Sequence, residues 1–315
     1  MIKLRHILLI GCTLLLSGLL SGCHFAILDP KGIIAASEKK LFIESILLML
    51  IVVVPVVIMS FVIPWHYRAN NTKATYTPHW AHSTLLEVIW WTIPCVIIVI
   101  LSVWTWIYTH TLDPYRPLAE DKNTVMIEAI AMNWKWLFIY PAQHMATVND
   151  MEIPVNKPVR LFISSDAPMN SLEIPRLAGQ IYAMTGMQTQ LNLMATSIGV
   201  YSGLSTNFSG DGFSGMTFKV GVVSQTDFDA WVKKAQQAPK QLTMAAYHQL
   251  TKPSENNPVE YFSNPERGLF SASVVKYMGP MPGMVLGYAS TEQGRAEIRT
   301  AHEANGVSES KRVEQ

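Results

Sequence analysis

Residues 85–108 read LLEVIWWTIPCVIIVILSVWTWIY, an apolar stretch with one acidic residue, Glu87. The stretch is about as long as the roughly 20 residues that a helix needs to cross a bilayer. Residues 41–63 form a second stretch of this kind. Each contains one proline, Pro55 or Pro94, which membrane helices tolerate. We therefore predict two transmembrane helices, at about residues 41–63 and 85–108, that form an antiparallel hairpin.

The amino terminus has the layout of an export signal. Residues 1–22 begin with Lys3 and Arg5, continue through an apolar core and end directly before Cys23. Residues 20–23, LSGC, resemble the bacterial lipobox, in which the chain is cut before the cysteine and that residue is acylated. We predict a signal peptide over residues 1–22 and a lipoprotein with palmitate on Cys23; a plain signal peptide is the alternative.

The orientation follows from export and not from charge. Lysine or arginine occurs both before the first apolar stretch and in the connecting segment 64–84, so the positive-inside rule is indecisive. A chain released outside at Cys23 returns to that side after two crossings. We therefore predict a multi-pass protein of the bacterial inner membrane whose residues from about 109 onward lie in the periplasm.

Composition excludes some classes of function. The chain has 315 residues, of which 49% are hydrophobic and 15% charged, and a formal net charge of +1 without a dense Lys/Arg tract. This composition suits a membrane protein and gives no reason to expect nucleic-acid binding. The carboxyl-terminal part contains no cysteine beyond Cys95. It can therefore form no disulfide and supply no thiolate ligand.

The part after the second stretch reads as β structure followed by helix. Residues 159–164 and 217–222 alternate in the period of strands, and the aromatic run 134–140 ends at a proline. Phe228, Trp231, Val232 and Ala235 then lie on one helical face, and 244–250 forms a second short helical segment. The predicted divisions are a signal peptide (1–22), a lipidated amino terminus with two membrane helices (23–110), a β-sandwich or barrel (111–225), a helical segment (226–280) and a disordered tail (281–315).

Several motifs within this order of parts carry a family resemblance. They are Trp134-Lys135-Trp136 with Tyr140-Pro141, Ile174 to Leu177, Gln180 to Met184, Gly186 to Thr189, Phe213 to Met216, and Pro258 to Ser263. Over about residues 20–280 the chain resembles subunit II of the haem-copper terminal oxidases. For the cytochrome c oxidase branch, the resemblance implies a cupredoxin-like barrel with a dinuclear copper centre.

The ligand positions of that copper centre carry other residues in this chain. The family pattern is a histidine, two cysteines four residues apart with a glutamate carbonyl between them, a second histidine and a methionine. These positions fall on Asn170, Leu204 and Phe208 with Thr206 between them, Gly212, and Gly215, with Met216 one residue beyond. A dinuclear copper site needs bridging thiolates and soft or imidazole donors, which these residues do not supply. Met216 is expected in the core, and His144 and His248 lie apart from these positions.

The pattern without ligands resembles the quinol oxidase branch, subunit II of the cytochrome bo type ubiquinol oxidases. That resemblance implies a proton-pumping complex of aerobic respiration that oxidises ubiquinol and reduces oxygen to water. It implies partners in subunit I, further membrane subunits and membrane lipid, with no cytochrome c. Two haems and one copper are expected in subunit I and no cofactor in this chain, which then has a structural or assembly role as a non-catalytic subunit.

Glu87 is the one residue with candidate chemistry. Glu87 lies seven residues before Pro94. It resembles the glutamate that, in the family, is placed at the entrance of a proton-uptake channel leading into subunit I. The alternative is a capping box with Thr84, which also favours an anion at a helix start. Trp134, Trp136 and Tyr140 are expected to pack, and Glu44 to lie in the membrane interface.

Two rival functions have different sequence requirements. A copper electron-transfer subunit of a cytochrome c oxidase needs thiolate ligands, which the absence of cysteine beyond Cys95 excludes. A stand-alone lipoprotein whose barrel binds a periplasmic ligand remains the other alternative. The interrupted membrane stretches and Glu87 favour packing against other membrane helices over simple anchoring.

Overall fold

The computed structural model describes residues 25–75, 77–279 and 285–304. The chain divides into two compact units, one of residues 37–116 and one that combines residues before 37 with those after 116. The predicted signal peptide and the predicted lipid site Cys23 lie outside the described residues.

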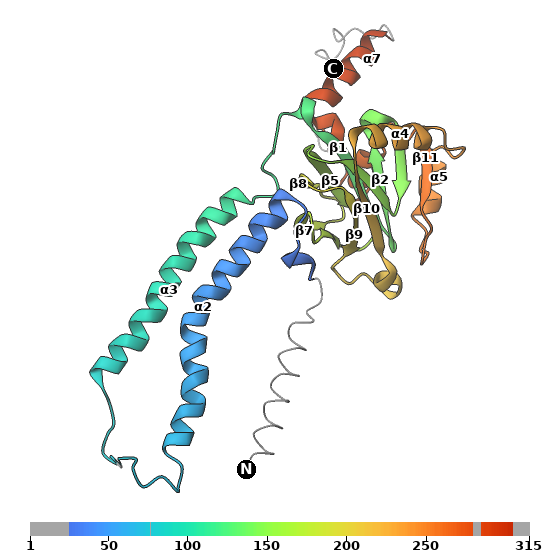
Figure 1. Cartoon of the computed structure of the whole chain (residues 1–315). Helices are drawn as coiled ribbons and strands as arrows, with labels where there is room; N and C mark the ends of the chain where they lie inside the picture. The colour runs from blue at the N-terminus through green and yellow to red at the C-terminus, as the bar shows by residue number, and fades with distance from the viewer. Residues whose placement is uncertain (1–24, 76, 280–284, 305–315) are drawn as a thin grey trace. The chain divides into compact units, whose positions relative to one another are not determined.

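The first unit contains two long apolar helices, α2 (Ile33–His66) and α3 (Thr84–Thr111), of which α2 begins in the other unit. Both are long and apolar enough to cross a membrane. The hydroxyl of Tyr108, late in α3, lies 3.3 Å from a carboxylate oxygen of Glu44, early in α2. The two helices therefore run side by side in opposite directions (Figure 1), which confirms the predicted hairpin.

The second unit is built around two β-sheets (Figure 1). The six-stranded sheet has the order β11-β3-β2-β1-β5-β8 and the five-stranded sheet the order β4-β10-β9-β6-β7. Two pairs, β1 with β5 and β4 with β10, are parallel, and the others are antiparallel. This arrangement confirms the predicted cupredoxin-like sandwich. The strands are β1 (Val125–Met132), β2 (Lys135–Tyr140), β3 (Met145–Val148), β4 (Asp150–Pro154), β5 (Val159–Ser165), β6 (Asn170–Ile174), β7 (Ala178–Ala183), β8 (Thr189–Leu193), β9 (Gly199–Ser205), β10 (Thr217–Val223) and β11 (Glu260–Ser263).

Both faces of the six-stranded sheet are covered. On β2, Trp136, Phe138 and Tyr140 belong to one hydrophobic cluster, whereas Leu137 and Ile139 belong to a second cluster with the C-terminal helices. Alternate side chains of a strand point to opposite faces. Every residue of β2 and β5 is therefore buried, and the aromatic run sits at the centre of the domain.

The helices after the sandwich are α4 (Gln225–Gln236), α5 (Met244–Leu250) and α6 (Leu269–Met278). The four apolar residues predicted to share one face of α4 are all buried. Short 3-10 turns complete the described elements: η1 (Ala26–Leu28), η2 (Asp121–Asn123), η3 (Pro141–Gln143), η4 (Asp211–Gly215) and η5 (Gly287–Ser290).

The prediction of a disordered tail from residue 281 is wrong for part of that tail. The turn η5 and the helix α7 (Glu292–Ala304) lie within it. The backbone N–H of Tyr288 donates to the carboxylate of Glu128 at 2.8 Å, and that of Gly287 donates to Gln188 at 2.6 Å. Leu286 and Tyr288 are buried. These contacts with the sandwich hold this part of the tail in a fixed structure, which its polar composition does not suggest.

The segment before α2 also binds the sandwich. The backbone N–H of Lys31 donates to Arg176 O at 2.6 Å, and its carbonyl accepts from the N–H of Thr196 at 2.7 Å. Gly32 forms an isolated β-bridge with Ala195, and a Cβ atom at Gly32 would lie 2.3 Å from the carbonyl oxygen of Leu177. Glycine at this position therefore permits the close approach of two backbones.

Candidate functional site

The candidate site is the set of positions where the copper ligands of the family would lie. Asn170, at the start of β6, and Met216, directly before β10, are both fully buried. The amide nitrogen of Asn170 lies 3.2 Å from the sulfur of Met216 and 3.1 Å from the hydroxyl of Ser209. The structure therefore places the first ligand position beside Met216. Met216, and not Gly215 as strict spacing gives, makes this contact, and it is a core residue as predicted.

The two cysteine positions lie in different surroundings. Leu204 is half-buried in β9, where it pairs with Thr217. Phe208 lies on the surface with 75% of its area exposed, and its ring packs edge to face against Phe213 at a centroid distance of 5.6 Å. Thr206, between them, contacts the hydroxyl of Ser171 at 2.6 Å. Thr206 therefore has a hydrogen-bonding role and Phe208 a ring contact, and Leu204 belongs to a paired strand.

The second histidine position has no room for a side chain. A Cβ atom on Gly212 would lie 2.5 Å from the ring of Trp134 and 2.7 Å from Glu255. Trp134 also donates its indole N–H to the carbonyl of Ser209 at 3.1 Å. Its backbone has a φ of 62°, a strained conformation for a bulky residue. The hydrogen bond to Ser209 anchors the Trp134 ring beside Gly212.

The residues at these positions do not fit a dinuclear copper centre. They offer one amide, one hydroxyl and one thioether, and neither a thiolate nor an imidazole. A thioether alone is a weak ligand, and the bridging positions of such a centre require thiolates. Within the described residues, no group of three or more His, Cys, Asp or Glu side chains is arranged to hold a metal ion.

The other two aromatic residues of the motif pack in the core, as predicted. The indole N–H of Trp136 donates to the hydroxyl of Ser205 at 2.9 Å, and its ring stacks near Phe138. The hydroxyl of Tyr140 donates to the carbonyl of Glu152 at 2.9 Å. Burial raises the pKa of Tyr140 well above its ordinary value. These side chains join the two sheets.

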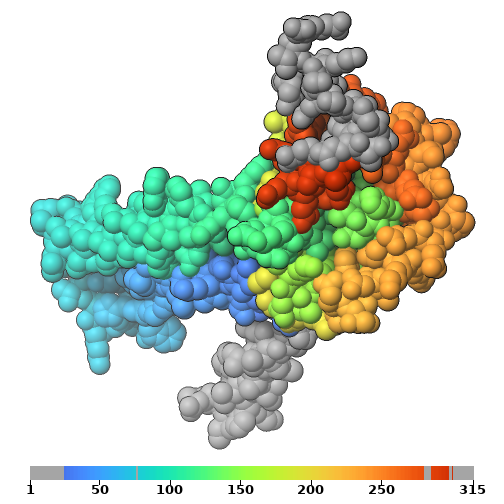
Figure 2. Space-filling model, turned by 90° about the horizontal axis from the view of Figure 1, so that it is seen from above, coloured from blue at the N-terminus to red at the C-terminus, as the bar shows by residue number. Residues whose placement is uncertain are grey.

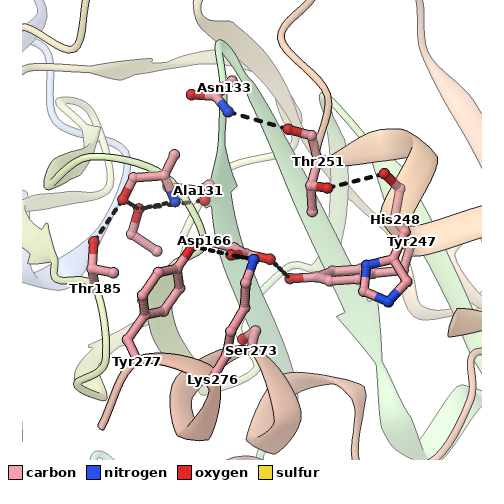
Figure 3. A network of polar contacts seen from close by, with 12 residues as sticks. Ala131, Asn133, Asp166, Thr185, Tyr247, His248, Thr251, Ser273, Lys276 and Tyr277 are labelled. Atoms are coloured by element: carbon pink, nitrogen blue, oxygen red, sulfur yellow. Dashed lines mark hydrogen bonds and ion pairs between the residues drawn. The ribbon is translucent and has the colours of Figure 1, made fainter.

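A buried carboxylate that the sequence analysis missed binds the helical segment to the sandwich (Figure 3). Asp166 follows β5, and its side chain is completely buried. It accepts from the hydroxyl of Tyr247 in α5 at 2.6 Å, and from Lys276 and Tyr277 in α6 at 2.7 and 2.6 Å. Burial and the carboxylate raise the pKa of Tyr247, and the hydrogen bond with Asp166 raises the pKa of Lys276. Asp166 in the sequence SSDAP signals only a turn, so nothing local indicates these distant partners.

Glu128 is a second buried carboxylate that the sequence did not reveal. Burial raises its pKa to about 7, although the hydrogen bond from the N–H of Tyr288 opposes the shift. It lines a cavity of about 130 Å³ together with His144 and Glu297. The pKa of Glu152 in β4 is also raised to about 7, chiefly by burial and then by the charge of Asp150.

Glu87 lies in the first turn of α3 and is partly exposed. The predicted capping box with Thr84 is wrong, because the cap residue is Ser83 and no side chain caps the helix end. The backbone N–H of Glu87 donates to the carbonyl of Ser83 at 2.9 Å. The carboxylate remains favoured near the positive end of the helix dipole. Glu44, near one end of α2, accepts from Tyr108 and has Lys40 at 3.8 Å.

Comparison with known proteins gives two family matches. Residues 96–223 match the family described as "Cytochrome C oxidase subunit II, periplasmic domain", and residues 236–281 match the "COX Aromatic Rich Motif".

Three curated relatives align over most of their length. The chain is 52% identical over 261 residues to cytochrome bo(3) ubiquinol oxidase subunit 2 of Pseudomonas putida, covering 83% of both chains. It is 48% identical over 283 residues to the subunit of the same name in Pseudomonas aeruginosa, covering 90% of this chain and 85% of the relative. It is 48% identical over 265 residues to ubiquinol oxidase subunit 2 of Acetobacter aceti, covering 84% and 86%.

Proposed function

The chain belongs to the subunit II family of the haem-copper oxidases, in its ubiquinol oxidase branch, and we propose that it is the non-catalytic subunit II of a proton-pumping ubiquinol oxidase. The complex oxidises ubiquinol within the membrane and reduces oxygen to water. The haems and the copper of the complex belong to subunit I, and this chain carries no cofactor. Its role is to support the assembly and structure of the complex.

The observation that carries this proposal is the filling of the copper-ligand positions by packing residues. Gly212 lies against the ring of Trp134, and Asn170 contacts Met216. A copper relay serves a soluble electron donor that docks outside the membrane. Ubiquinol delivers electrons from within the bilayer, so a subunit that lacks the relay suits this donor.

The membrane helices support a place among other membrane subunits. Almost no side chain in their apolar windows is buried within the isolated chain. In the assembled complex these surfaces contact subunit I, further membrane subunits and lipid of the bacterial inner membrane. The sandwich lies in the periplasm, and cytochrome c is not among its partners.

Purification tests the proposed complex directly. Tagged protein is purified in mild detergent, and its optical spectrum, copper content and quinol-driven oxygen uptake are measured. We expect co-purified haem, oxygen uptake with ubiquinol and none with reduced cytochrome c. A colourless protein without partner chains would contradict the proposal.

We also propose that Glu87 collects protons from the cytoplasm for uptake by the complex. Ionisable groups in membrane helices are commonly functional, and Glu87 lies in the first turn of α3, where no side-chain cap forms. Glu87→Gln should slow proton uptake and turnover while leaving assembly and the haem spectrum intact, and Glu87→Asp should restore part of the rate. Glu120→Gln, at a carboxylate paired with exposed Lys122, is the control. Normal proton uptake in Glu87→Gln would remove this residue from the mechanism.

The lipid on Cys23 is a separate proposal. The sequence LSGC that precedes the folded segment supports it. Mass spectrometry of the amino-terminal peptide should find a chain that begins at an acylated Cys23, and Cys23→Ala should remove the added mass. An unmodified cysteine at the start of the mature chain would contradict acylation.

A further inference from the structure

A loop of the aromatic-rich segment lies against the vacated copper positions. This cover loop, Thr251–Asn257, lies between α5 and β11, in the orange part of the chain next to α5 in Figure 1. Figure 2 shows that orange residues of the C-terminal part form a portion of the surface of this unit. Polar side chains from two turns of the sandwich bind it. The hydrogen bonds run from Asn133 Nδ2 to Thr251 O (3.1 Å), from Lys135 Nζ to Lys252 O (2.9 Å) and to Ser254 Oγ, and from Asn149 Nδ2 to Asn257 O (3.1 Å).

Lys135 is the charged group among these attachments. Only 2% of the residue is exposed. Burial lowers the pKa of its amino group, and the charge of Glu260 opposes the shift. A buried cation is costly unless polar groups satisfy it. Both hydrogen-bond partners of this amino group belong to the cover loop, so separating the loop from the sandwich would leave the cation without them.

The other side of the cover loop contacts the segment that would hold copper. We call residues 206–216, between β9 and β10, the frame loop. The side chain of Glu255 lies 2.7 Å from the Cβ position of Gly212, and the amide oxygen of Asn256 lies 3.1 Å from that of Gly215. The cover loop therefore lies between its attachments on the sandwich and the second histidine position.

The frame loop needs such contacts. It contains three glycines, whose ordering costs more conformational entropy than that of other residues. Metal–ligand bonds would tie this loop to β6 in the copper branch of the family. In this chain, neutral hydrogen bonds form that link: Asn170 contacts Ser209 and Met216, and Thr206 contacts Ser171. Neutral hydrogen bonds contribute little net stability each.

We propose that the aromatic-rich segment serves as an internal clamp, whose cover loop holds the frame loop closed in place of metal–ligand bonds. The clamp joins the two turns of the sandwich to the frame loop through Lys135 on one side and Glu255 and Asn256 on the other. Asp166 binds α5 and α6, the helices before and after β11, to the sandwich. The cover loop, which follows α5, therefore begins at a helix that is held in place.

Hydrogen–deuterium exchange of the full-length chain in its purified assembly tests the clamp. Lys135→Met keeps the length of the side chain and removes the cation. The backbone N–H groups of Phe213 and Met216, which donate within the frame loop, are the reporters. We expect both the cover loop and these reporters to exchange at least about tenfold faster, while β1 remains unchanged. Lys252→Met, which keeps the carbonyl that Lys135 binds, is the matched control and should change exchange less than twofold.

A second variant separates the clamp from general loosening. Glu255→Ala combined with Asn256→Gly removes the two side chains over the frame loop and leaves every attachment to the sandwich. Asn256 has a φ of 50°, which glycine adopts without strain. The reporters should exchange faster while Thr251 and Lys252 keep their protection. Reporter exchange within twofold of the parent chain in this double variant would overturn the proposal, whether or not Lys135→Met folds. The readout does not depend on turnover, so it is independent of the proposed oxidase function.

Discussion

The amide nitrogen of Asn170 lies 3.2 Å from the sulfur of Met216, although 46 positions separate the two residues. The same amide nitrogen contacts Ser209, and its oxygen accepts from the N–H of Ser171. The first ligand position of the family is therefore joined to Met216 through a neutral side chain.

This relationship predicts an asymmetric effect of substitution. Asn170→Ala leaves buried polar groups without partners and should cost about 1–3 kcal/mol of stability. Met216→Leu conserves volume and loses only a weak acceptor, so it should cost less than about 1.5 kcal/mol. Thermal unfolding of the full chain in detergent measures both. Equal losses in the two variants would mean that the sulfur matters as much as the amide.

Space at the second histidine position predicts a difference between two nearby glycines. Gly212→Ala brings a methyl group against the Trp134 ring and should cost about 1–3 kcal/mol. Gly215→Ala meets only the end of the Asn256 side chain, which can rotate away. The thermal midpoint of Gly212→Ala should therefore fall further. A stable Gly212→Ala variant with an unchanged environment of Trp134 would contradict this packing.

The buried carboxyl of Glu128 predicts a pH dependence of stability. Its folded-state pKa, about 7, lies above the ordinary value of 4.5, so the folded protein holds the proton more tightly. Its stabilising contribution is complete below about pH 4.5 and is lost as the pH rises through about 7. The loss is on the order of 3 kcal/mol.

Glu128→Gln should flatten this dependence. The glutamine keeps an oxygen for the N–H of Tyr288 and carries no charge. Between pH 5 and 8, unfolding of the variant should change less with pH than that of the parent chain. Glu152→Gln is the comparison, since Glu152 titrates in the same range but is half-buried and should contribute less. Parallel pH profiles of parent and Glu128→Gln would refute the assignment.

The buried Asp166 predicts that a single substitution loosens α5 and α6. Asp166→Ala leaves the buried hydroxyl of Tyr247 without its acceptor and removes the partner of Lys276, at a cost of about 3 kcal/mol. Proteolysis should then cut residues 240–279 before the sandwich. Tyr277→Phe removes one half-exposed contact and should cost less than about 1 kcal/mol. Unaltered protease resistance in Asp166→Ala would show that apolar packing alone holds the helices.

Local patterns predicted the parts of the fold that have short periods. The two apolar stretches predicted α2 and α3, and the apolar face that contains Phe228 and Trp231 predicted α4. The alternation in residues 159–164 located β5 but not its burial on both faces, because covering by distant helices leaves no sign in the strand itself.

The sequence predicted which positions form the candidate site, but it did not predict the contacts that attach the surrounding segments to the sandwich. Spacing located Asn170 and Gly212, and the residue that contacts Asn170 is Met216, one position beyond the Gly215 that strict spacing gives. Asp166 and Glu128 bind partners 81 to 160 positions away. No local sequence rule reports contacts at such separations.

The binding of Lys135 to the cover loop also sets an order of events during synthesis of the chain. The carbonyl that Lys135 binds belongs to a residue made 117 positions later. At roughly 5–20 residues per second, that delay is roughly 6 to 23 s. The strands through β10 are made before the cover loop exists, so the frame loop lacks its clamp during this interval. A ribosome that stalls before residue 252 therefore leaves the strands through β10 without the clamp on the frame loop, and also without β11 and α6.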